Sequence, residues 1–404
     1  RAMHTADEGD ARALRPRTRG PYAPRTRDTR ELGATVPANR WSPLWQGVAR
    51  LGGLLPEAGA ENADEGSVLR GRGDASGSRR SHGSLVRTAG GKDDRIGPRF
   101  DAEVPPGGYT WWYVDAISDD GQHALTIIAF VGSVFSPYYK RSGRDDPIDH
   151  CALNVALYGP EARWVMTERP RGRVRREARM LEIGPSRVEW KDDALHIHIE
   201  ERDTRLFNPV HRPVRGVVKV YPEALNPTSF ALDHDEKHIW HCLAPRARIE
   251  VKMEKPGLSW KGKGYFDHNR GSESLEEGFR VWHWSRAHTK RGALVCYEGE
   301  RRDGSLFASA IRFDREGVAE DADLPPIARL PRSKWRVERS ARSEISVARV
   351  RRTWEDTPFY ARSELSSHLD GEEVVAVQES LDMRRFASPI VQFMLPYRMP
   401  RRKK

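Results

Sequence analysis

The stretch "DDGQHALTIIAFVGSV", from Asp119 to Val134, decides the fold class of this sequence. It opens with an Asp120-Gly121 pair, which is typical of tight turns, and continues as an apolar run far shorter than the roughly 20 residues of a membrane-spanning helix. Other runs alternate apolar and polar residues with the period of two that half-buried strands show. Four of them are "HCALNVALYG" (150–159), "ALHIHIEERD" (194–203), "RGVVKVYPEAL" (215–225) and "RIEVKMEK" (248–255). The folded part is therefore predicted to be all-β.

Two further stretches predict β-hairpins. In "VCYEGERRDGSLFASAIRF" the turn falls at Asp303-Gly304, and in "SSHLDGEEVVAVQESL" it falls at Asp370-Gly371. Asp-Gly pairs favour the tight two-residue turns that join antiparallel strands, because glycine adopts a positive φ without strain. The sheets are therefore expected to be antiparallel.

Strands this short and this numerous are typical of β-barrels and β-sandwiches, and one small barrel would not use them all. We therefore predict two β-domains, residues 99–250 and 251–404, although no internal repeat marks the boundary between them. Helical periodicity is weak except over Asp382–Leu395, where a short C-terminal helix is expected.

Residues 1–98 differ in composition from the rest of the chain, being rich in Arg, Gly, Ala, Ser and Pro and poor in aliphatic residues. Such a segment buries too little apolar surface to offset its ordering entropy, so a disordered basic tail is predicted, with a short helix or docking segment at 39–55. This tail and the terminal "RRKK" account for much of the +10 net charge. Attachment to anionic lipid or nucleic acid is one interpretation of the charge, and a solvated tail without a role is the other.

The three cysteines, Cys151, Cys242 and Cys296, are far apart and odd in number. This usage indicates reduced thiols in a cytoplasmic setting rather than a disulfide framework. The N-terminal region has arginines but no apolar core of a signal peptide, so neither a secretory signal nor a transmembrane segment is expected.

Reactive side chains gather between His238 and Asp267. In "KHIWHC", His238 and Trp240 lie two residues apart, and in "GYFDHN", Tyr265 and Asp267 do. Residues two apart in a strand project from the same face of the sheet. If both strands line one cavity, the two pairs form an aromatic wall that holds a carboxyl group and an imidazole.

An acid-base site is the chemical interpretation of this pattern. Enclosure by apolar rings disfavours the charged form of Asp267 and raises its pKa, so that this acid could donate a proton near neutral pH. His238 could accept a proton from water, and the rings could stabilise a developing cation. Two alternatives stay open, because tryptophan pairs at strand spacing usually belong to a core, and His238 and Asp267 could simply share a buried hydrogen bond. A metal site is not predicted, since His238 and His241 would face opposite sides of the strand.

Four long segments resemble the carotenoid 1,2-hydratases, also called hydroxyneurosporene synthases, of purple phototrophic bacteria. They are "GGYTWWYVDAISDDGQHALTIIAFVGSVFSPYY", "HIWHCLAPRARIEV", "GKGYFDHNRGSESLEEGFRVWHWSRA" and "SPIVQFMLPYRMPRR". The resemblance covers roughly residues 98–402 and leaves out the tail. It implies two lipocalin-like antiparallel β-barrels or half-barrels that meet at a substrate tunnel, in agreement with the strand pattern.

The resemblance also implies a hydro-lyase that needs no cofactor and adds water across the terminal double bond of an acyclic carotenoid such as neurosporene or lycopene. The functional residues of the family fall on His238, Trp240, Tyr265 and Asp267. Asp267 would protonate the alkene, Trp240 and Tyr265 would face the resulting cation, and His238 would orient or deprotonate the water. The residues expected to line the tunnel, from aromatic content, are Trp111, Trp112, Tyr113, Trp282 and Trp284.

A substrate this apolar resides in membranes, so we expect peripheral attachment to the cytoplasmic face of the intracytoplasmic photosynthetic membrane. The tail and "YRMPRRKK" are the candidate contacts with an anionic membrane surface. No metal, cofactor or nucleic-acid partner is expected, and the sequence leaves the oligomeric state open. The alternative function is a carotenoid or lipid carrier that binds without reacting, and a nucleic-acid-associated protein that uses the Arg-rich tail is a third hypothesis.

Overall fold

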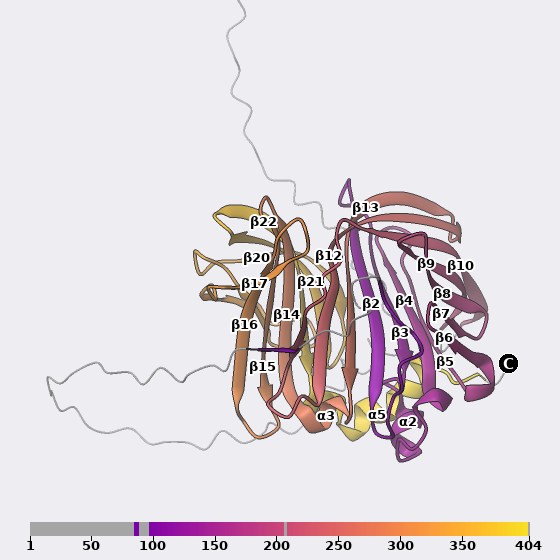
Figure 1. Cartoon of the computed structure of the whole chain (residues 1–404). Helices are drawn as coiled ribbons and strands as arrows, with labels where there is room; N and C mark the ends of the chain where they lie inside the picture. The colour runs from indigo at the N-terminus through magenta and orange to yellow at the C-terminus, as the bar shows by residue number, and fades with distance from the viewer. Residues whose placement is uncertain (1–84, 89–96, 206–207, 403–404) are drawn as a thin grey trace, which may run out of the picture. The chain divides into compact units, whose positions relative to one another are not determined.

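The computed structural model describes residues 85–88, 97–205 and 208–402 of the 404-residue chain. These residues form a thirteen-stranded sheet, a seven-stranded sheet and a small two-stranded sheet (Figure 1). The strands within each sheet pair antiparallel. The prediction of an all-β antiparallel fold is confirmed.

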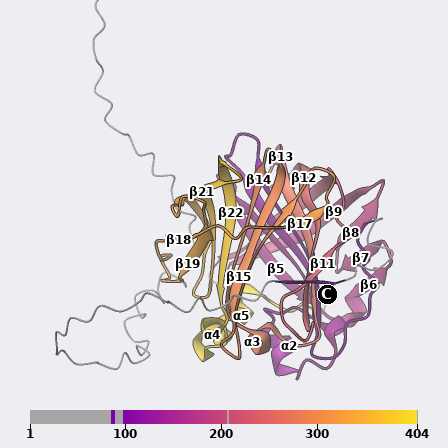
Figure 2. The same cartoon turned by 60° about the vertical axis from the view of Figure 1, so that its left-hand side comes forward.

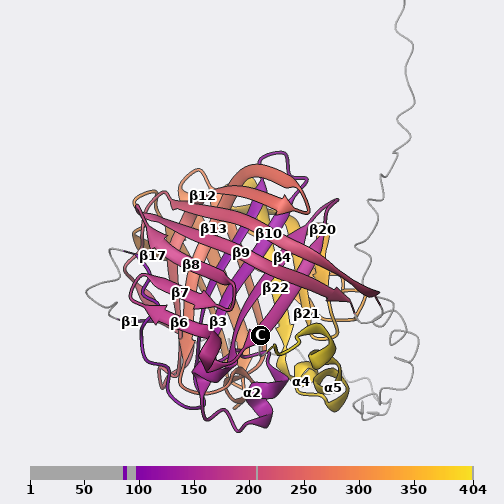
Figure 3. The ribbon, with the colours of Figure 1, turned by 90° about the vertical axis from the view of Figure 1, so that its right-hand side faces the viewer.

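The thirteen-stranded sheet, called the first sheet below, curls into a nearly closed barrel (Figure 3). Its strand order is β5-β4-β3-β2-β13-β12-β10-β9-β8-β7-β6, while β11 pairs with β12 and β1 pairs with β11. Strand β5 contacts β9, and Arg169 of β5 donates a hydrogen bond of 3.1 Å to Glu201 of β9. The strands are β1 (Val86–Thr88), β2 (Tyr109–Ser118), β3 (Ala124–Val131), β4 (Cys151–Tyr158), β5 (Arg163–Arg169), β6 (Val174–Glu177), β7 (Met180–Ile183), β8 (Ser186–Lys191), β9 (Ala194–Arg205), β10 (Asn208–Pro222), β11 (Ser229–Ala231), β12 (His238–Lys255) and β13 (Leu258–Gly271).

The seven-stranded sheet, called the second sheet below, has the order β17-β16-β15-β14-β22-β21-β20. Two of its connections are the predicted hairpins, through Asp303-Gly304 and through Asp370-Gly371. Asp370 and Gly371 have φ angles of 54° and 76°, as a tight hairpin turn requires. The strands, with those of the two-stranded sheet, are β14 (Phe279–Thr289), β15 (Gly292–Arg301), β16 (Leu306–Phe313), β17 (Ala319–Ala322), β18 (Ile327–Leu330), β19 (Arg339–Arg342), β20 (Arg349–Asp356), β21 (Tyr360–Leu369) and β22 (Glu372–Asp382).

The helices gather at one end of the two sheets (Figures 1 and 2). They are α2 (Pro137–Arg141), α3 (Leu275–Gly278), α4 (Met383–Phe386) and α5 (Pro389–Arg398), with the 3-10 turns η3 (Pro147–His150) and η4 (Arg171–Arg173). The predicted C-terminal helix is thus confirmed as two helices, and among the described residues no helix is long and apolar enough to cross a bilayer.

The C-terminal segment links the two sheets. After β22 the chain passes through α4 and α5 and then reaches β5, where Arg401 forms ion pairs with Asp149 at 2.6 Å and Glu168 at 2.5 Å. Because both partners belong to the first sheet or its adjoining turn, α5 is held across the end of the space between the sheets. This position matters for access to the cavity described below.

The domain boundary expected at residue 250 falls inside β12 (His238–Lys255). This strand pairs with both β10 and β13, so the first sheet continues to Gly271 and the second begins at Phe279. Pro245 lies within β12 at an irregularity of the β12–β13 ladder, where a missing N–H is tolerated. The boundary between sheets therefore lies about 20 to 30 residues later than expected.

Strand β1 lies in the segment predicted to be disordered. Its residues Val86–Thr88 pair with Ser229–Ala231, and the preceding Leu85 is buried. Backbone pairing with an anchored apolar side chain offsets the local cost of ordering, which composition does not reveal. The other residues of the predicted tail up to residue 96, including the docking segment at 39–55, lie outside the described residues.

Candidate active site

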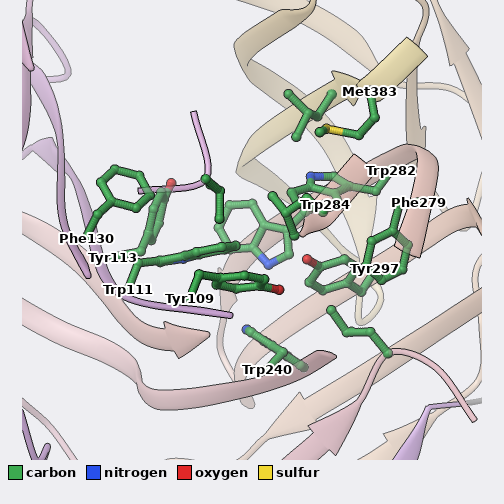
Figure 4. Close-up of a cluster of buried hydrophobic side chains, with 14 of the residues drawn as sticks. Tyr109, Trp111, Tyr113, Phe130, Trp240, Phe279, Trp282, Trp284, Tyr297 and Met383 are labelled. Atoms are coloured by element: carbon green, nitrogen blue, oxygen red, sulfur yellow. The ribbon is translucent and has the colours of Figure 1, made fainter. Parts of the chain in front are cut away.

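A cavity with a volume of about 140 Å³ lies between the first and second sheets. Its wall is mostly aromatic, and Figure 4 shows Trp111 and Tyr113 of β2 projecting toward Trp282 and Trp284 of β14. The aromatic lining comprises Trp111, Tyr113, Phe130, Phe135, Trp164, Trp282, Trp284, Tyr297, Phe359 and Tyr360. Polar groups among the lining are Thr126, Asn154, Asp267, Asn269, Glu355, Thr357, Glu379 and Arg398.

Alternation along β2 divides the predicted aromatic residues between two cores. Trp111 and Tyr113 line the cavity, whereas Trp112 points into the barrel of the first sheet. There the Trp112 ring stacks on His268 at 5.1 Å and lies 4.8 Å from Phe100. The expectation that Trp112 lines the same tunnel is wrong, because adjacent residues of a strand face opposite sides.

Asp267 sits in the cavity wall with three hydrogen-bond donors around its carboxyl group. The Tyr265 hydroxyl and the Trp240 Nε1 donate to Oδ2 at 2.9 and 3.1 Å. Asn269 Nδ2 donates to Oδ1 at 2.9 Å. Trp240 Nε1 also lies 3.2 Å from the Tyr265 hydroxyl, and neither of these two residues lines the cavity itself. Trp240 and Tyr265 therefore hold the carboxyl group from behind, and Asp267 faces the cavity.

Burial raises the pKa of Asp267 well above its ordinary value, because the charged form loses its hydration. The hydrogen bonds from Tyr265 and Trp240 act in the opposite direction, and the negative charges of Glu379 and Asp115 raise the pKa further. Desolvation is the largest effect, and the side chain is 4% exposed. Burial thus favours the protonated form of Asp267, and three hydrogen-bond donors are already in place for its conjugate base.

His238 lies behind the cavity wall. Its Nδ1 is 2.8 Å from the Tyr109 hydroxyl, its Nε2 is 3.4 Å from Glu273, and the ring does not line the cavity. Tyr109 in turn stacks on Trp111 at 4.9 Å (Figure 4). Burial lowers the pKa of His238, which favours the neutral imidazole. Among the described residues no hydrogen bond joins His238 to Asp267, so these two predicted site residues are not brought together.

Several residues in the cavity wall or directly behind it were not assigned to the site from the sequence. Asn269 follows Asp267 by two residues in the same strand, so the same-face rule was sufficient to find it. Tyr109 stands at the start of the aromatic run on the face of Trp111 and was detectable in the same way. Glu379 reaches the cavity only because β22 pairs with β14, and no local pattern in its strand indicates that pairing.

The chain is similar to proteins of one family. Residues 127–404 match the family described as "Carotenoid hydratase CrtC". The "Acyclic carotenoid 1,2-hydratase" of Thiocapsa roseopersicina is 48% identical over 395 residues, which cover 94% of this chain and 96% of the relative. The protein of the same name from Rubrivivax gelatinosus is 43% identical over 410 residues, covering 99% of this chain and 100% of the relative.

The extent of the similarity differs among the relatives. The alignments with these two proteins reach into residues 1–98, although the resemblance was expected to begin near residue 98. The "Acyclic carotenoid 1,2-hydratase" of Cereibacter sphaeroides is 41% identical over 278 residues, which cover 68% of this chain and 98% of the relative. By its family match and by full-length relatives at this level of identity, the chain belongs to the CrtC family of carotenoid hydratases.

Proposed function

We propose that this protein is an acyclic carotenoid 1,2-hydratase, which adds water to the terminal double bond of a substrate such as neurosporene or lycopene. The observation that carries the proposal is the carboxyl group of Asp267 in the wall of an aromatic cavity, where burial raises its pKa. The names of relatives that align with nearly the whole chain support it. A carrier would need the apolar cavity but not the acid, because burying a polar group costs free energy without aiding the binding of a hydrocarbon.

Catalysis begins with a proton transfer from Asp267 to the less substituted carbon of the double bond. The π electrons form the new C–H bond and leave a tertiary cation at the other carbon. As negative charge develops on Asp267, the donors Tyr265, Trp240 and Asn269 stabilise it. These interactions are stronger in the transition state than in the resting acid, so they lower the barrier rather than only tighten binding.

The cation forms among aromatic faces, and water then captures it. The rings of Trp284 and Tyr113 both line the cavity together with Asp267, and their centroids lie 5.8 Å apart in an edge-to-face arrangement. A cation over such a face is stabilised by about 2 kcal/mol when it is desolvated. His238 contributes indirectly, because its hydrogen bond to Tyr109 fixes the ring on which Trp111 stacks.

A second part of the proposal is peripheral attachment to an anionic membrane surface through α5. The outward face of this helix carries no charged residue: Ile390, Phe393 and Tyr397 are 50%, 67% and 42% exposed. These positions recur at the spacing of one helix face. Basic residues flank the helix in the chain, namely Arg384 and Arg385 before it and Arg402 after it. An apolar face bordered by basic side chains suits the headgroup region of an anionic bilayer.

The opposite face of α5 belongs to the cavity. Leu395 is buried and lines it, and so do Arg398 and Met399 at the end of the helix. A bilayer that contacts Phe393 would therefore be separated from the cavity only by one helix. This arrangement supports entry of a membrane-dissolved polyene past α5 without exposure to water.

The hydration test uses lycopene in detergent or liposomes, with chromatography and mass spectrometry of the product. A product heavier by one water supports the hydratase, whereas bound but unchanged pigment would support the carrier. In heavy water the product should also gain one carbon-bound deuterium per hydrated end, because the proton of Asp267 exchanges with solvent between turnovers.

Flotation with phosphatidylglycerol vesicles at low and high salt tests the membrane contact. Phe393→Ser should weaken binding at both salt concentrations, since it removes apolar area from the bilayer. Val318→Ser is the matched control, because Val318 is 59% exposed in a loop away from α5. Equal loss in both variants, or a wild type that binds no vesicles, would refute docking through α5. A dimer that dissociates on Phe393→Ser would assign the face to a second copy instead.

A further inference from the structure

A second carboxyl group, that of Glu379, lines the same cavity as Asp267. Glu379 lies in β22, where its backbone pairs with Trp284 of β14 and with Arg362 of β21. The two acids come from different sheets, Asp267 from the first and Glu379 from the second. A ligand in the cavity would therefore meet one carboxyl group from each sheet.

Buried charges hold Glu379 in place. It forms an ion pair with Arg362, whose side chain is 0% exposed and also pairs with Asp115 at 3.1 Å. The Tyr113 hydroxyl donates to Glu379 Oε1 at 2.6 Å, and Arg362 binds the same oxygen. No described residue donates to Oε2, and the side chain is 13% exposed. The protein thus holds one oxygen and leaves the other available to a water molecule in the cavity.

Tyr113 connects the two acids. Its backbone is the register partner of Asp267 in the neighbouring strand, and its hydroxyl binds Glu379. Both carboxyl groups therefore lie on the side of the first sheet from which Tyr113 projects. Their surroundings differ, because Asp267 has no cationic partner in its hydrogen-bond shell and Glu379 is paired with a guanidinium. Two carboxyl groups in such different surroundings are suited to opposite roles in proton transfer.

We propose that Glu379 is the base that orients the attacking water and accepts its proton. The proposal rests on the hydratase function and assigns its second half-reaction. A lone pair of the water oxygen forms the C–O bond to the tertiary cation, and one O–H bond of that water breaks as its proton passes to Glu379 Oε2. Glu379 then releases the proton to solvent, and Asp267 takes one up, so that the net change is the addition of one water.

The other candidates fit this step less well. His238 does not line the cavity, and its Nδ1 is engaged by Tyr109. Asp267 is a carboxylate after the first step, but donors already occupy both of its oxygens. Glu379 Oε2 has no such donor among the described residues.

The test compares kcat and KM of Glu379→Gln and Glu379→Ala for lycopene hydration. Removing a general base should lower kcat about 10²- to 10⁴-fold, while KM stays within about threefold because the apolar contacts are unchanged. Added formate should raise the kcat of Glu379→Ala at least about tenfold, because a small carboxylate can occupy the space that the glutamate side chain leaves. If Glu379 only neutralised the charge of Arg362, formate would restore kcat and thermal stability together. A rise in kcat without a rise in thermal stability therefore indicates a general base.

A buried carboxylate elsewhere supplies the control. Glu201 is buried and pairs with Arg169 at 3.1 Å, away from the cavity, so Glu201→Gln should lower stability without lowering kcat. If Glu379→Gln does not fold, Glu379→Asp replaces it in the test. This variant keeps the negative charge beside Arg362, but its side chain is one methylene shorter, so the carboxyl oxygen lies farther from the water. Its kcat should fall at least about tenfold, since a displacement of about 1 Å costs up to 10²-fold.

The outcomes separate this role from the function itself. A wild type that forms no hydrated product would refute the hydratase. An active wild type together with near-normal kcat in Glu379→Gln, or in a folded Glu379→Asp, would refute only the role of Glu379. Loss of activity that formate does not restore and that parallels the loss of thermal stability would also overturn it.

Discussion

Replacing Asp267 by asparagine should abolish the proton transfer and leave the fold intact. Tyr265 and Trp240 donate to one carboxyl oxygen, and Asn269 donates to the other. In Asp267→Asn the amide oxygen can keep the first two bonds, and the new NH2 group would face Asn269. Rotation of the Asn269 amide by 180° then presents its oxygen to that NH2 group. All partners remain satisfied, so the free energy of unfolding should change by no more than about 1 kcal/mol.

The effect on the reaction should be far larger. A positioned general acid contributes about 10²- to 10⁴-fold, which corresponds to roughly 3–5 kcal/mol of transition-state free energy. The amide has no proton acidic enough to replace the carboxylic acid. The binding of lycopene should change little, because the shape and apolar lining of the cavity are kept. The loss should therefore appear in kcat rather than in KM.

The assay is chromatographic quantification of the hydrated product over time, with urea unfolding of the same preparations. Asp203→Asn is the matched control, since Asp203 is also buried but lies outside the cavity. A folded Asp267→Asn variant that keeps more than about a tenth of the wild-type kcat would refute the assignment of the acid. An equal loss in the Asp203 variant would point to unfolding instead.

Three further predictions follow from the same geometry. Burial raises the pKa of Asp267 above its ordinary 3.8, so hydration should decline as pH rises through the raised value. As pH rises, Asp267 ionises first in the unfolded state, because its pKa there is the lower one. The free energy of unfolding of wild type should therefore fall relative to that of Asp267→Asn as pH rises above about 4. Urea unfolding at several pH values would contradict this if the difference between the two proteins stayed constant. Trp240→Phe removes one donor from Asp267 and should lower kcat about tenfold or more at unchanged KM, which steady-state kinetics would measure. Trp284→Phe should raise KM because Trp284 lines the cavity, whereas Trp112→Phe should lower only the unfolding midpoint. A raised KM in the Trp112 variant would argue against the alternation of side chains between the two faces of β2.

Local pattern was sufficient for much of the fold and part of the site. The hairpins at Asp303-Gly304 and Asp370-Gly371 follow from turn chemistry, which depends on only a few neighbouring residues. The pairing of Tyr265 with Asp267 on one face follows from the period of a strand, and their hydrogen bond agrees with it. Applied to β2, the same period would have excluded Trp112.

Long-range pairing was beyond the reach of local pattern. The domain boundary was misplaced because β12 and β13 look like ordinary strands, and only their ladders with β10 and β2 show that they belong to the first sheet. The site was affected in the same way, since Glu379 comes beside the cavity through its register with Trp284. Non-local register depends on the packing of whole sheets, which no short window of sequence contains.

The sequence by itself determined the all-β class, the hairpin turns, the C-terminal helix and the position of Tyr265 and Asp267 on one face of their strand. Each of these depends on side-chain chemistry or on a period of a few residues. Only the tertiary structure decided that His238 stands behind the wall, that Trp112 faces the barrel and that Glu379 shares the cavity with Asp267. The physical reason is that the cavity forms where two sheets meet, so its composition depends on which strands are adjacent in space rather than in the chain.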